Sequence, residues 1–326
     1  MDQPKHEPSA KRRRIAFYRP WVQTAFLALW LWPRAWSMHW MPGCVFHCYA
    51  CPLSTFACPI GVMGQFAALN LLPVLALGVL VLVGAAVGSL VCGWACPFGW
   101  AQDLLAKLPL PKFRIPTWMG YGRYAVLVGL VIVVPWVMGR QGVDYDDQAV
   151  NICTLCPAGA AEAKVPYLVE QGWKAAADQA WYARTWSAVR HAGVDFFTVA
   201  KVHETPDGAG GASATVSYVP FIKNMILLSL VVVAMVTFRP WCTVLCPLGG
   251  IFALFNRYSL FYLHFNSRTC RACNLCRSYC VYGVKVEQSI NNTHCIRCLE
   301  CTTCGGVEPA LGPRKKADSE ASLAPR

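Results

Sequence analysis

Apolar residues in this chain gather into four long runs, each bordered by basic residues or by a Cys-Pro sequence. A helix needs about 20 mainly apolar residues to cross the hydrocarbon core of a bilayer. The runs therefore predict transmembrane helices over residues 15–36, 62–91, 119–138 and 218–238. Pro73 lies inside the second run, where we expect it to kink the helix.

The basic residues beside these runs predict which side of the membrane each loop faces. Cytoplasmic loops of membrane proteins are enriched in Lys and Arg. The first 14 residues contain five Lys or Arg, and the loop after the second run contains Lys107, Lys112 and Arg114. Residues 140–217 instead contain six Lys or Arg against nine Asp or Glu. We therefore expect a multi-pass protein of the inner membrane, with both termini in the cytoplasm and residues 140–217 in the periplasm.

This topology predicts a membrane all-α core of four transmembrane helices, with a periplasmic insertion and a C-terminal ferredoxin-like module that holds two [4Fe–4S] clusters. The insertion is expected to be mainly helical, with a helix over 158–200 and a turn over 206–211. The predicted domains are a basic tail 1–14, spans one to three 15–139, the insertion 140–217, the fourth span with its Cys-Pro sequence 218–266, the ferredoxin-like module 267–304 and a disordered tail 305–326.

The composition agrees with insertion into a membrane. The chain has 326 residues, of which 56% are hydrophobic and 14% are charged, whereas soluble domains carry about 25% charged residues. A net charge of +12 would also suit binding to nucleic acid. The basic residues lie beside apolar runs, however, so we assign them to membrane topology and expect no nucleic-acid partner.

Two cysteine runs near the C-terminus predict iron–sulfur chemistry. They read C-x2-C-x2-C-x3-C and C-x2-C-x2-C-x2-C, and 14 residues separate them. In two-cluster ferredoxins the last cysteine of a run binds the other cluster. The ligands assigned to one [4Fe–4S] cluster are Cys270, Cys273, Cys276 and Cys304, and those assigned to the other are Cys280, Cys295, Cys298 and Cys301. Structural zinc is the alternative, because C-x2-C pairs also bind zinc.

A second cysteine pattern, Cys-Pro-x-Gly, occurs four times, at Cys58, Cys96, Cys156 and Cys246. We expect the proline to end a helix and the glycine to allow a tight turn, which would hold the cysteine at a rigid corner. Two copies extend to C-x3-C-P at the predicted cytoplasmic ends of the second and fourth spans. The thiols of these two copies, which we call the inner thiols, are those of Cys92, Cys96, Cys242 and Cys246. They suffice for a further [4Fe–4S] cluster; redox-active dithiols and structural packing are the alternatives.

Six more cysteines fall on the predicted periplasmic side. They are Cys44, Cys48, Cys51, Cys58, Cys153 and Cys156. Four of these thiols would be enough for another membrane-proximal cluster, but outward-facing cysteines also form disulfides. An electron cannot cross about 30 Å of hydrocarbon in one efficient step. Cysteine sites at both ends of the spans would divide that distance into shorter steps.

The combination of C-x3-C-P after the second and fourth spans with a C-terminal double ferredoxin run resembles the NapH/NosR-type membrane polyferredoxins. The resemblance covers residues 15–139 and 218–304. It implies a quinol-dehydrogenase membrane component, an oxidoreductase subunit that passes electrons between a quinone pool, or a cytoplasmic donor, and a periplasmic reductase or electron-transfer protein. It also implies that the inner C-x3-C-P cysteines and the eight ferredoxin cysteines are cluster ligands.

The chain departs from the family pattern, and other functions remain open. Val281 and Gly305 stand where proline usually follows each ferredoxin run. Asp103, near the inner Cys-Pro turn, is the candidate proton acceptor for quinol oxidation, with a plain helix-surface carboxylate as the alternative. A copper reductase or assembly factor would use the same thiols as metal ligands. A transmembrane thiol–disulfide relay would use them as redox pairs.

Overall fold

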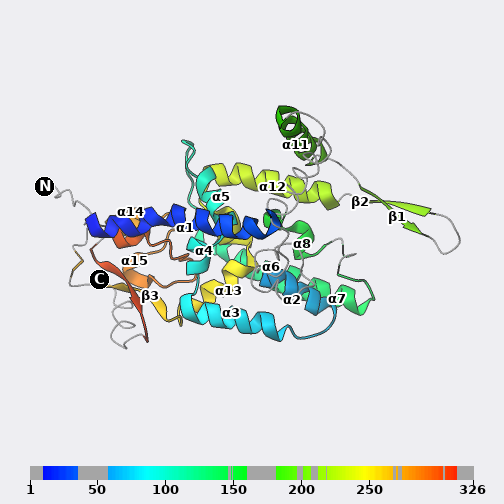
Figure 1. Cartoon of the computed structure of the whole chain (residues 1–326). Helices are drawn as coiled ribbons and strands as arrows, with labels where there is room; N and C mark the ends of the chain where they lie inside the picture. The colour runs from blue at the N-terminus through cyan, green and yellow to red at the C-terminus, as the bar shows by residue number, and fades with distance from the viewer. Residues whose placement is uncertain are drawn as a thin grey trace. The chain divides into compact units, whose positions relative to one another are not determined.

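The computed structural model describes residues 10–35, 58–145, 148, 150–159, 181–196, 201–206, 212–217, 219–266, 269–270, 274–303 and 305–313. The chain divides into two compact units. Figure 1 labels their helices and strands and colours them by residue number. Unit 1 contains residues 1–44, 74–128 and 234–326, and unit 2 contains residues 45–73 and 129–233.

Unit 1 is built from helices and a small C-terminal sheet. Its helices are α1 (Ala10–Ala35), α3 (Val74–Val87), α4 (Leu90–Trp94), α5 (Pro97–Leu105), α6 (Gly122–Val126), α13 (Pro247–Phe255), α14 (Leu275–Tyr279) and α15 (Val286–Ser289). Helix α1 packs on α4 and α5, and α13 packs on α3 and α6. Figure 1 shows α3 and α13 side by side. Both C-x3-C-P segments therefore lie in one unit.

The C-terminal part of unit 1 has its own apolar core. Strand β3 (Phe261–Phe265) pairs antiparallel with β4 (Val307–Leu311). The residues buried together beneath this pair are Leu263, Cys276, Val286, Ile290, Leu299, Cys301 and Val307. The prediction of a disordered tail from residue 305 is wrong for residues 305–313, because β4 completes the sheet of the ferredoxin-like module.

The second predicted span is two helices rather than one. Helix α2 (Pro59–Ala68) belongs to unit 2, whereas α3 belongs to unit 1. Asn70, between them, has a φ of 56°, a left-handed conformation that commonly follows a helix end. Pro73 precedes the first residue of α3, where its missing N–H is tolerated. The kink expected at Pro73 is therefore a complete break.

One helix among the described residues, Thr117–Arg140, is long and apolar enough to cross a membrane. It has 24 residues, which is about 36 Å of helix, and it contains a wider π-type segment at Leu127–Val133. Val74–Val87 and Phe221–Val236 are apolar but shorter. The predicted core of four spans is therefore supported at its third position and is not confirmed at the other three.

Unit 2 contains helices and a hairpin. Its elements are α2, α7 (Val134–Arg140), α8 (Ile152–Leu155), α9 (Pro157–Gly159), α11 (Trp181–Phe196), β1 (Lys201–Pro206), β2 (Ala212–Ser217) and most of α12 (Val219–Val236). Helix α2 packs closely on α7, because a Cβ on Gly139 would lie 1.9 Å from Ala68 O. The hairpin pairs Lys201 with Ser217 and Pro206 with Ala212. The mainly helical prediction missed these two strands, which are short and mostly polar.

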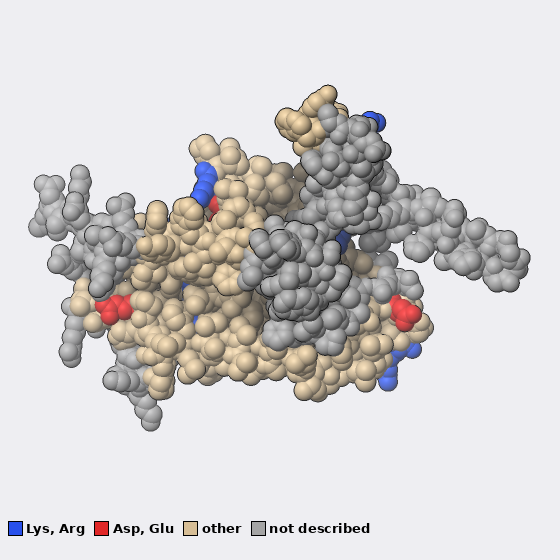
Figure 2. All heavy atoms as spheres, viewed as in Figure 1, with Lys and Arg blue, Asp and Glu red and all other residues tan. Residues whose placement is uncertain are grey.

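The described surface carries few charges. Figure 2 shows one face on which Lys, Arg, Asp and Glu side chains are sparse among the described atoms. Large apolar side chains are exposed along several of the described helices. Examples are Leu82 at 72%, Trp118 at 71% and Val232 at 57%. Such exposure is common on surfaces that meet lipid or a partner protein.

Candidate iron–sulfur sites

Each Cys-Pro-x-Gly sequence begins a helix. Cys58, Cys96 and Cys246 are the N-caps of α2, α5 and α13, and a proline follows at the first helical position. Proline suits that position because its fixed φ is helical and its missing N–H would have no helical partner. In two copies the glycine N–H donates to the capping thiol, Gly99 N to Cys96 Sγ at 3.4 Å and Gly249 N to Cys246 Sγ at 3.5 Å. The helix before the motif also ends there, since Cys156 is the C-cap of α8 and Cys246 is the C-cap of the π-type turn Trp241–Leu245. The proline therefore ends one helix, as expected, and begins the next.

The glycine of the motif provides space rather than a turn. Neither Gly99 nor Gly249 is among the residues with positive φ. A Cβ on Gly99 would lie 3.3 Å from Cys92 O, and a Cβ on Gly249 would lie 3.0 Å from Cys242 O. Each C-x3-C segment therefore folds back onto the first turn of the helix that follows it, which brings its two thiols to the same helix end.

The structure brings the four inner thiols together. Cys92 and Cys242 are buried, and Cys96 and Cys246 are partly buried. The pKa of Cys92 is raised from 9.0 to about 12, mainly because the side chain is buried and secondly because the Cys242 thiolate lies nearby. Burial, followed by the charges of Cys242 and Cys92, raises the pKa of Cys246 well above its usual value. Four-iron clusters bind thiolates, and the N-termini of α5 and α13 favour that negative charge.

Gln102 reaches the inner thiols from α5 and is 2% exposed. Its Nε2 donates to Cys242 Sγ at 3.3 Å, and its Oε1 accepts from Trp241 N at 3.2 Å. One side chain thus ties the second C-x3-C segment to the helix of the first. The sequence interpretation missed this residue. The available signal was a polar residue at the sixth position of α5, where α13 has Phe252.

A buried ion network supports the Cys92 segment. Arg239 is 0% exposed and donates to the two carboxylate oxygens of Asp103 at 2.7 and 2.5 Å, and to Cys92 O at 2.5 Å. Arg19 of α1 donates to Asp103 Oδ2 at 2.5 Å and to Gly93 O at 3.0 Å. Asp103 is therefore paired with two arginines and is not a plain surface carboxylate.

The thiols assigned to the second ferredoxin cluster line one cavity. The four are Cys280, Cys295, Cys298 and Cys301. The cavity has about 360 Å³ of empty space, including its open part, and apolar side chains such as Leu263 and Ile290 share its lining. Burial, followed by the charge of Cys298, raises the pKa of Cys295 to about 12. Four thiols around one mainly apolar cavity are a donor set that fits a cubane cluster.

The first ferredoxin cluster site is described in part. Cys270 and Cys276 are described, whereas Cys273 and Cys304 lie outside the described residues. A Cβ on Gly306 would lie 3.4 Å from Cys270 Cβ. The chain just after the second cysteine run therefore meets the start of the first run, as the crossed ligation pattern requires.

The second cysteine run packs directly against the segment that carries Cys92. A Cβ on Gly93 would lie only 2.5 Å from Ile296 O. Trp94 Nε1 donates to Arg297 O at 3.2 Å, and Ser89 Oγ donates to Cys295 O at 2.7 Å. The ferredoxin-like module and the inner thiols therefore meet through backbone contacts, with no side-chain layer at Gly93.

Three of the six cysteines that were predicted to be periplasmic come together in unit 2. Burial, followed by the charges of Cys153 and Cys156, raises the pKa of Cys58 to about 12. Tyr145 OH donates to Cys153 Sγ at 3.3 Å, and Lys223 Nζ donates to Cys153 O at 3.0 Å. The remaining predicted members lie outside the described residues; they are Cys44, Cys48 and Cys51.

The arrangement of the described thiols bears on their chemistry. None of the 13 described cysteines is in a disulfide. No three described His, Cys, Asp or Glu side chains converge closely enough to hold a single metal ion. A four-iron cubane is larger than one ion, so its ligands lie farther apart. The inner set and the cavity of the second run both fit a cluster, in which four thiolates would hold the iron atoms.

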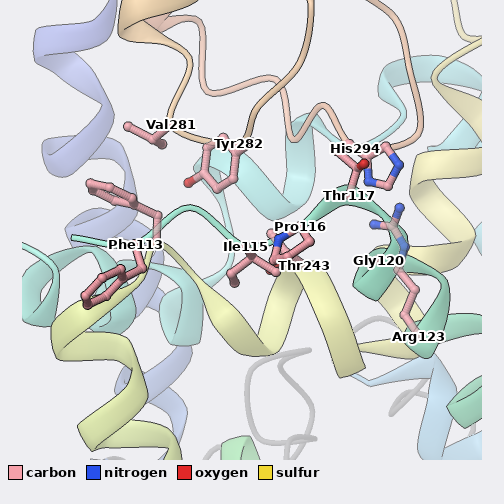
Figure 3. A pocket seen from close by; sticks show the side chains of 11 residues that line it. Phe113, Ile115, Pro116, Thr117, Gly120, Arg123, Thr243, Val281, Tyr282 and His294 are labelled. Atoms are coloured by element: carbon pink, nitrogen blue, oxygen red, sulfur yellow. The ribbon is translucent and has the colours of Figure 1, made fainter.

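A cleft of unit 1 lies among three cysteine segments (Figure 3). Its lining includes Thr243, which follows Cys242, Tyr282, which is two residues beyond Cys280, and His294, which precedes Cys295. Figure 3 shows Thr117, Arg123 and His294 at one end and Phe113, Val281 and Tyr282 at the other. These side chains give the cleft both apolar walls and hydrogen-bonding groups.

Comparison with known families supports iron–sulfur binding. A family described as a 4Fe-4S binding domain matches residues 69–116 and 225–266. Each matched segment contains one C-x3-C-P sequence. The match therefore falls on the inner cysteines rather than on the C-terminal ferredoxin runs, and these two segments are similar to a 4Fe-4S binding domain.

Similar proteins occur in an archaeon and in bacteria. The chain is 36% identical over 61 residues to one uncharacterized protein of Methanocaldococcus jannaschii. These 61 residues are 19% of this chain and 25% of that protein. It is 23% identical over 233 residues to a second uncharacterized protein of that organism, 68% of this chain and 71% of the relative. It is 22% identical over 247 residues to the regulatory protein NosR of Stutzerimonas stutzeri, 72% of this chain and 26% of NosR.

These similarities confirm the predicted resemblance to NosR-type polyferredoxins. The chain spans about a quarter of the length of NosR and of the first archaeal relative. No solved structure matches this chain.

Proposed function

We propose that this chain is an iron–sulfur electron-transfer protein of the inner membrane that relays electrons between a quinol pool, or a cytoplasmic donor, and a periplasmic redox partner. In this proposal the C-terminal module holds two [4Fe–4S] clusters, the inner thiols hold a third, and the cysteines of unit 2 hold a fourth. When bound, the clusters supply one-electron redox chemistry. The protein supplies the ligands, the dry surroundings and the spacing.

The observation that carries this proposal is the contact between the second cysteine run and the Cys92 segment. Ile296 O lies where Gly93 leaves room for it, and Cys295 O accepts a hydrogen bond from Ser89. Ligand loops of two sites are therefore in direct contact. Short separations favour electron transfer between carriers, and a module that merely stored metal would not need its ligand loops in contact.

Membrane insertion is supported by the apolar helix Thr117–Arg140. Its length of 24 residues exceeds the roughly 20 needed to cross a bilayer. Ile132 and Val133 on this helix, and Val232 and Val233 on α12, are exposed. We propose that these apolar surfaces face lipid, with the basic loops cytoplasmic and residues 140–217 periplasmic.

The cleft of Figure 3 is the proposed site of quinol oxidation. Arg123 is 2% exposed, and its Nε has no hydrogen-bond partner among the described residues. A quinol headgroup is flat and apolar with two oxygens, so it would match apolar walls that carry a buried donor. Thr243 and His294, the chain neighbours of Cys242 and Cys295, line the cleft, so in this proposal a bound ring would lie close to two cluster ligands.

Electron paramagnetic resonance of the fully reduced protein tests the relay. Neighbouring reduced clusters are paramagnetic and broaden each other's signals. We expect coupled signals in the unmodified protein and simpler, uncoupled ferredoxin signals in Cys246→Ala, which removes one inner ligand. Identical spectra would show that no inner cluster lies beside the ferredoxin module, and the proposal would fail.

Binding of a fluorescent quinol analogue, 2-heptyl-4-hydroxyquinoline N-oxide, tests the cleft separately. We expect Arg123→Met to weaken the binding and Arg140→Met to leave it unchanged. Arg140 is exposed at the last position of the helix Thr117–Arg140, which also contains Arg123, and it lines no part of the cleft. Equal binding in both variants would refute the cleft and leave the relay untouched.

A further inference from the structure

The inner thiols receive hydrogen bonds that differ in origin. Cys96 and Cys246 each accept from the N–H of the glycine in their own motif. Both bonds follow from the repeated sequence and so occur in both copies. Cys242 instead accepts from a side chain, Gln102 Nε2, at 3.3 Å.

This side-chain donor breaks the internal repeat. Helices α5 and α13 are both nine residues long and begin with the same Cys-Pro-x-Gly sequence. Gln102 is the sixth residue of α5, and the sixth residue of α13 is Phe252. The first copy therefore places an amide on the thiol of the second copy, whereas the second copy has only an apolar ring at the matching position.

Burial makes the donor effective. Gln102 is 2% exposed and Cys242 is 5% exposed, so little water competes for the sulfur. The amide is held at both ends, because Oε1 accepts from Trp241 N at 3.2 Å while Nε2 donates to Cys242 Sγ and to Phe98 O. A fixed donor in dry surroundings acts more strongly on a charged acceptor than a mobile surface group does.

We propose that Gln102 is a positioning residue that raises the reduction potential of the inner cluster through its hydrogen bond to Cys242. This inference rests on the proposed function, because it requires a [4Fe–4S] cluster on the inner thiols. Reduction adds one electron and makes the ligand sulfurs more negative. An N–H that donates to sulfur therefore stabilises the reduced cluster more than the oxidised cluster, and such bonds are among the known determinants of cluster potential.

The chain offers a matched control. Gln23 of α1 is 1% exposed, and its Nε2 donates to Gly93 O at 3.0 Å. It is a buried amide next to the same Cys92 segment, but its hydrogen bond goes to a carbonyl oxygen. Gln23→Leu and Gln102→Leu therefore each remove one buried amide, and Gln102→Leu alone removes a bond to sulfur.

Redox titration followed by electron paramagnetic resonance tests the proposal on the purified, cluster-loaded protein in detergent. The signal of the inner cluster is the one that disappears in Cys246→Ala. At a fixed ambient potential we expect Gln102→Leu to lower the ratio of reduced to oxidised inner cluster by about tenfold, which corresponds to 59 mV for a one-electron couple. Gln23→Leu should leave that ratio unchanged.

A second variant guards against loss of the cluster. Gln102→Met keeps an unbranched side chain of similar length but has no N–H donor, so we expect it to lower the ratio about as far as Gln102→Leu does. An unchanged potential in Gln102→Leu or Gln102→Met would overturn the proposal. Loss of the cluster from both variants, with Gln23→Leu intact, would make Gln102 purely structural and would also overturn it. Absence of the inner signal from the unmodified protein would instead refute the proposed function.

Discussion

Substitution of Gly93 by alanine separates the ferredoxin-like module from the inner thiols without removing any cysteine. The added Cβ would lie 2.5 Å from Ile296 O and 3.2 Å from Arg297 O. Both atoms belong to the backbone, so a side-chain rotation cannot relieve the overlap, and either the ligand loop or α4 must move. Overpacking a well-packed interior costs about 1–3 kcal/mol.

Gly78→Ala in α3 is the matched control. A Cβ there has nothing within 4 Å, and alanine favours a helix over glycine by up to about 1 kcal/mol. Both substitutions gain this helical preference, and only Gly93→Ala suffers the overlap. We therefore expect Gly93→Ala to be less stable than Gly78→Ala by about 1–3 kcal/mol.

Thermal unfolding of the two variants in the same detergent measures this difference. One kcal/mol shifts the Tm of a domain of about 200 residues by about 2–4 °C, so the variants should differ by several degrees. The coupling between inner and ferredoxin signals should also weaken in Gly93→Ala and persist in Gly78→Ala. If the two variants have the same Tm and the same spectra, the ferredoxin loop does not rest on the Cys92 segment as described.

Two further predictions follow from buried charge. Arg239→Met should lower the free energy of unfolding by about 3 kcal/mol. This is the lower end for a broken buried pair, because the Asp103 side chain is 24% exposed. Denaturant unfolding of Arg239→Met and of the surface variant Arg140→Met measures the difference, and equal stability of the two would argue against the network. In the iron-free protein, burial raises the pKa of Cys92 from 9.0 to about 12, so the unfolded state loses its thiol proton first and stability should fall as the pH rises above about 9. A Tm that stays constant from about pH 8 to 10 would contradict this.

Where spacing alone decides the outcome, the sequence predicted which cysteines lie near one another, whereas their role as cluster ligands stays a prediction. The ferredoxin runs follow this rule, since Cys280 and the three described cysteines of the second run line one cavity. The C-x3-C-P pairs are another case, because the same short motif builds the same helix start twice. Local sequence determines the local geometry in both places.

Other features depended on contacts between distant segments. Pro73 predicted a kink in the second run, but the complete break between α2 and α3, with the left-handed Asn70 after the end of α2, was not predicted. Gln102 and Arg239 act across 140 and 147 positions of the chain, on Cys242 Sγ and Cys92 O. The hairpin β1–β2 has short, largely polar strands, which hydrophobic periodicity cannot distinguish from a loop.

Iron and acid-labile sulfide content per chain tests the central claim most directly. The account predicts that Cys246→Ala, compared with the unmodified protein, loses about four irons and four sulfides, the content of one cubane, while the ferredoxin signals remain. Unchanged iron and sulfide in this variant would show that the inner thiols hold no cluster, and the relay through them would be contradicted.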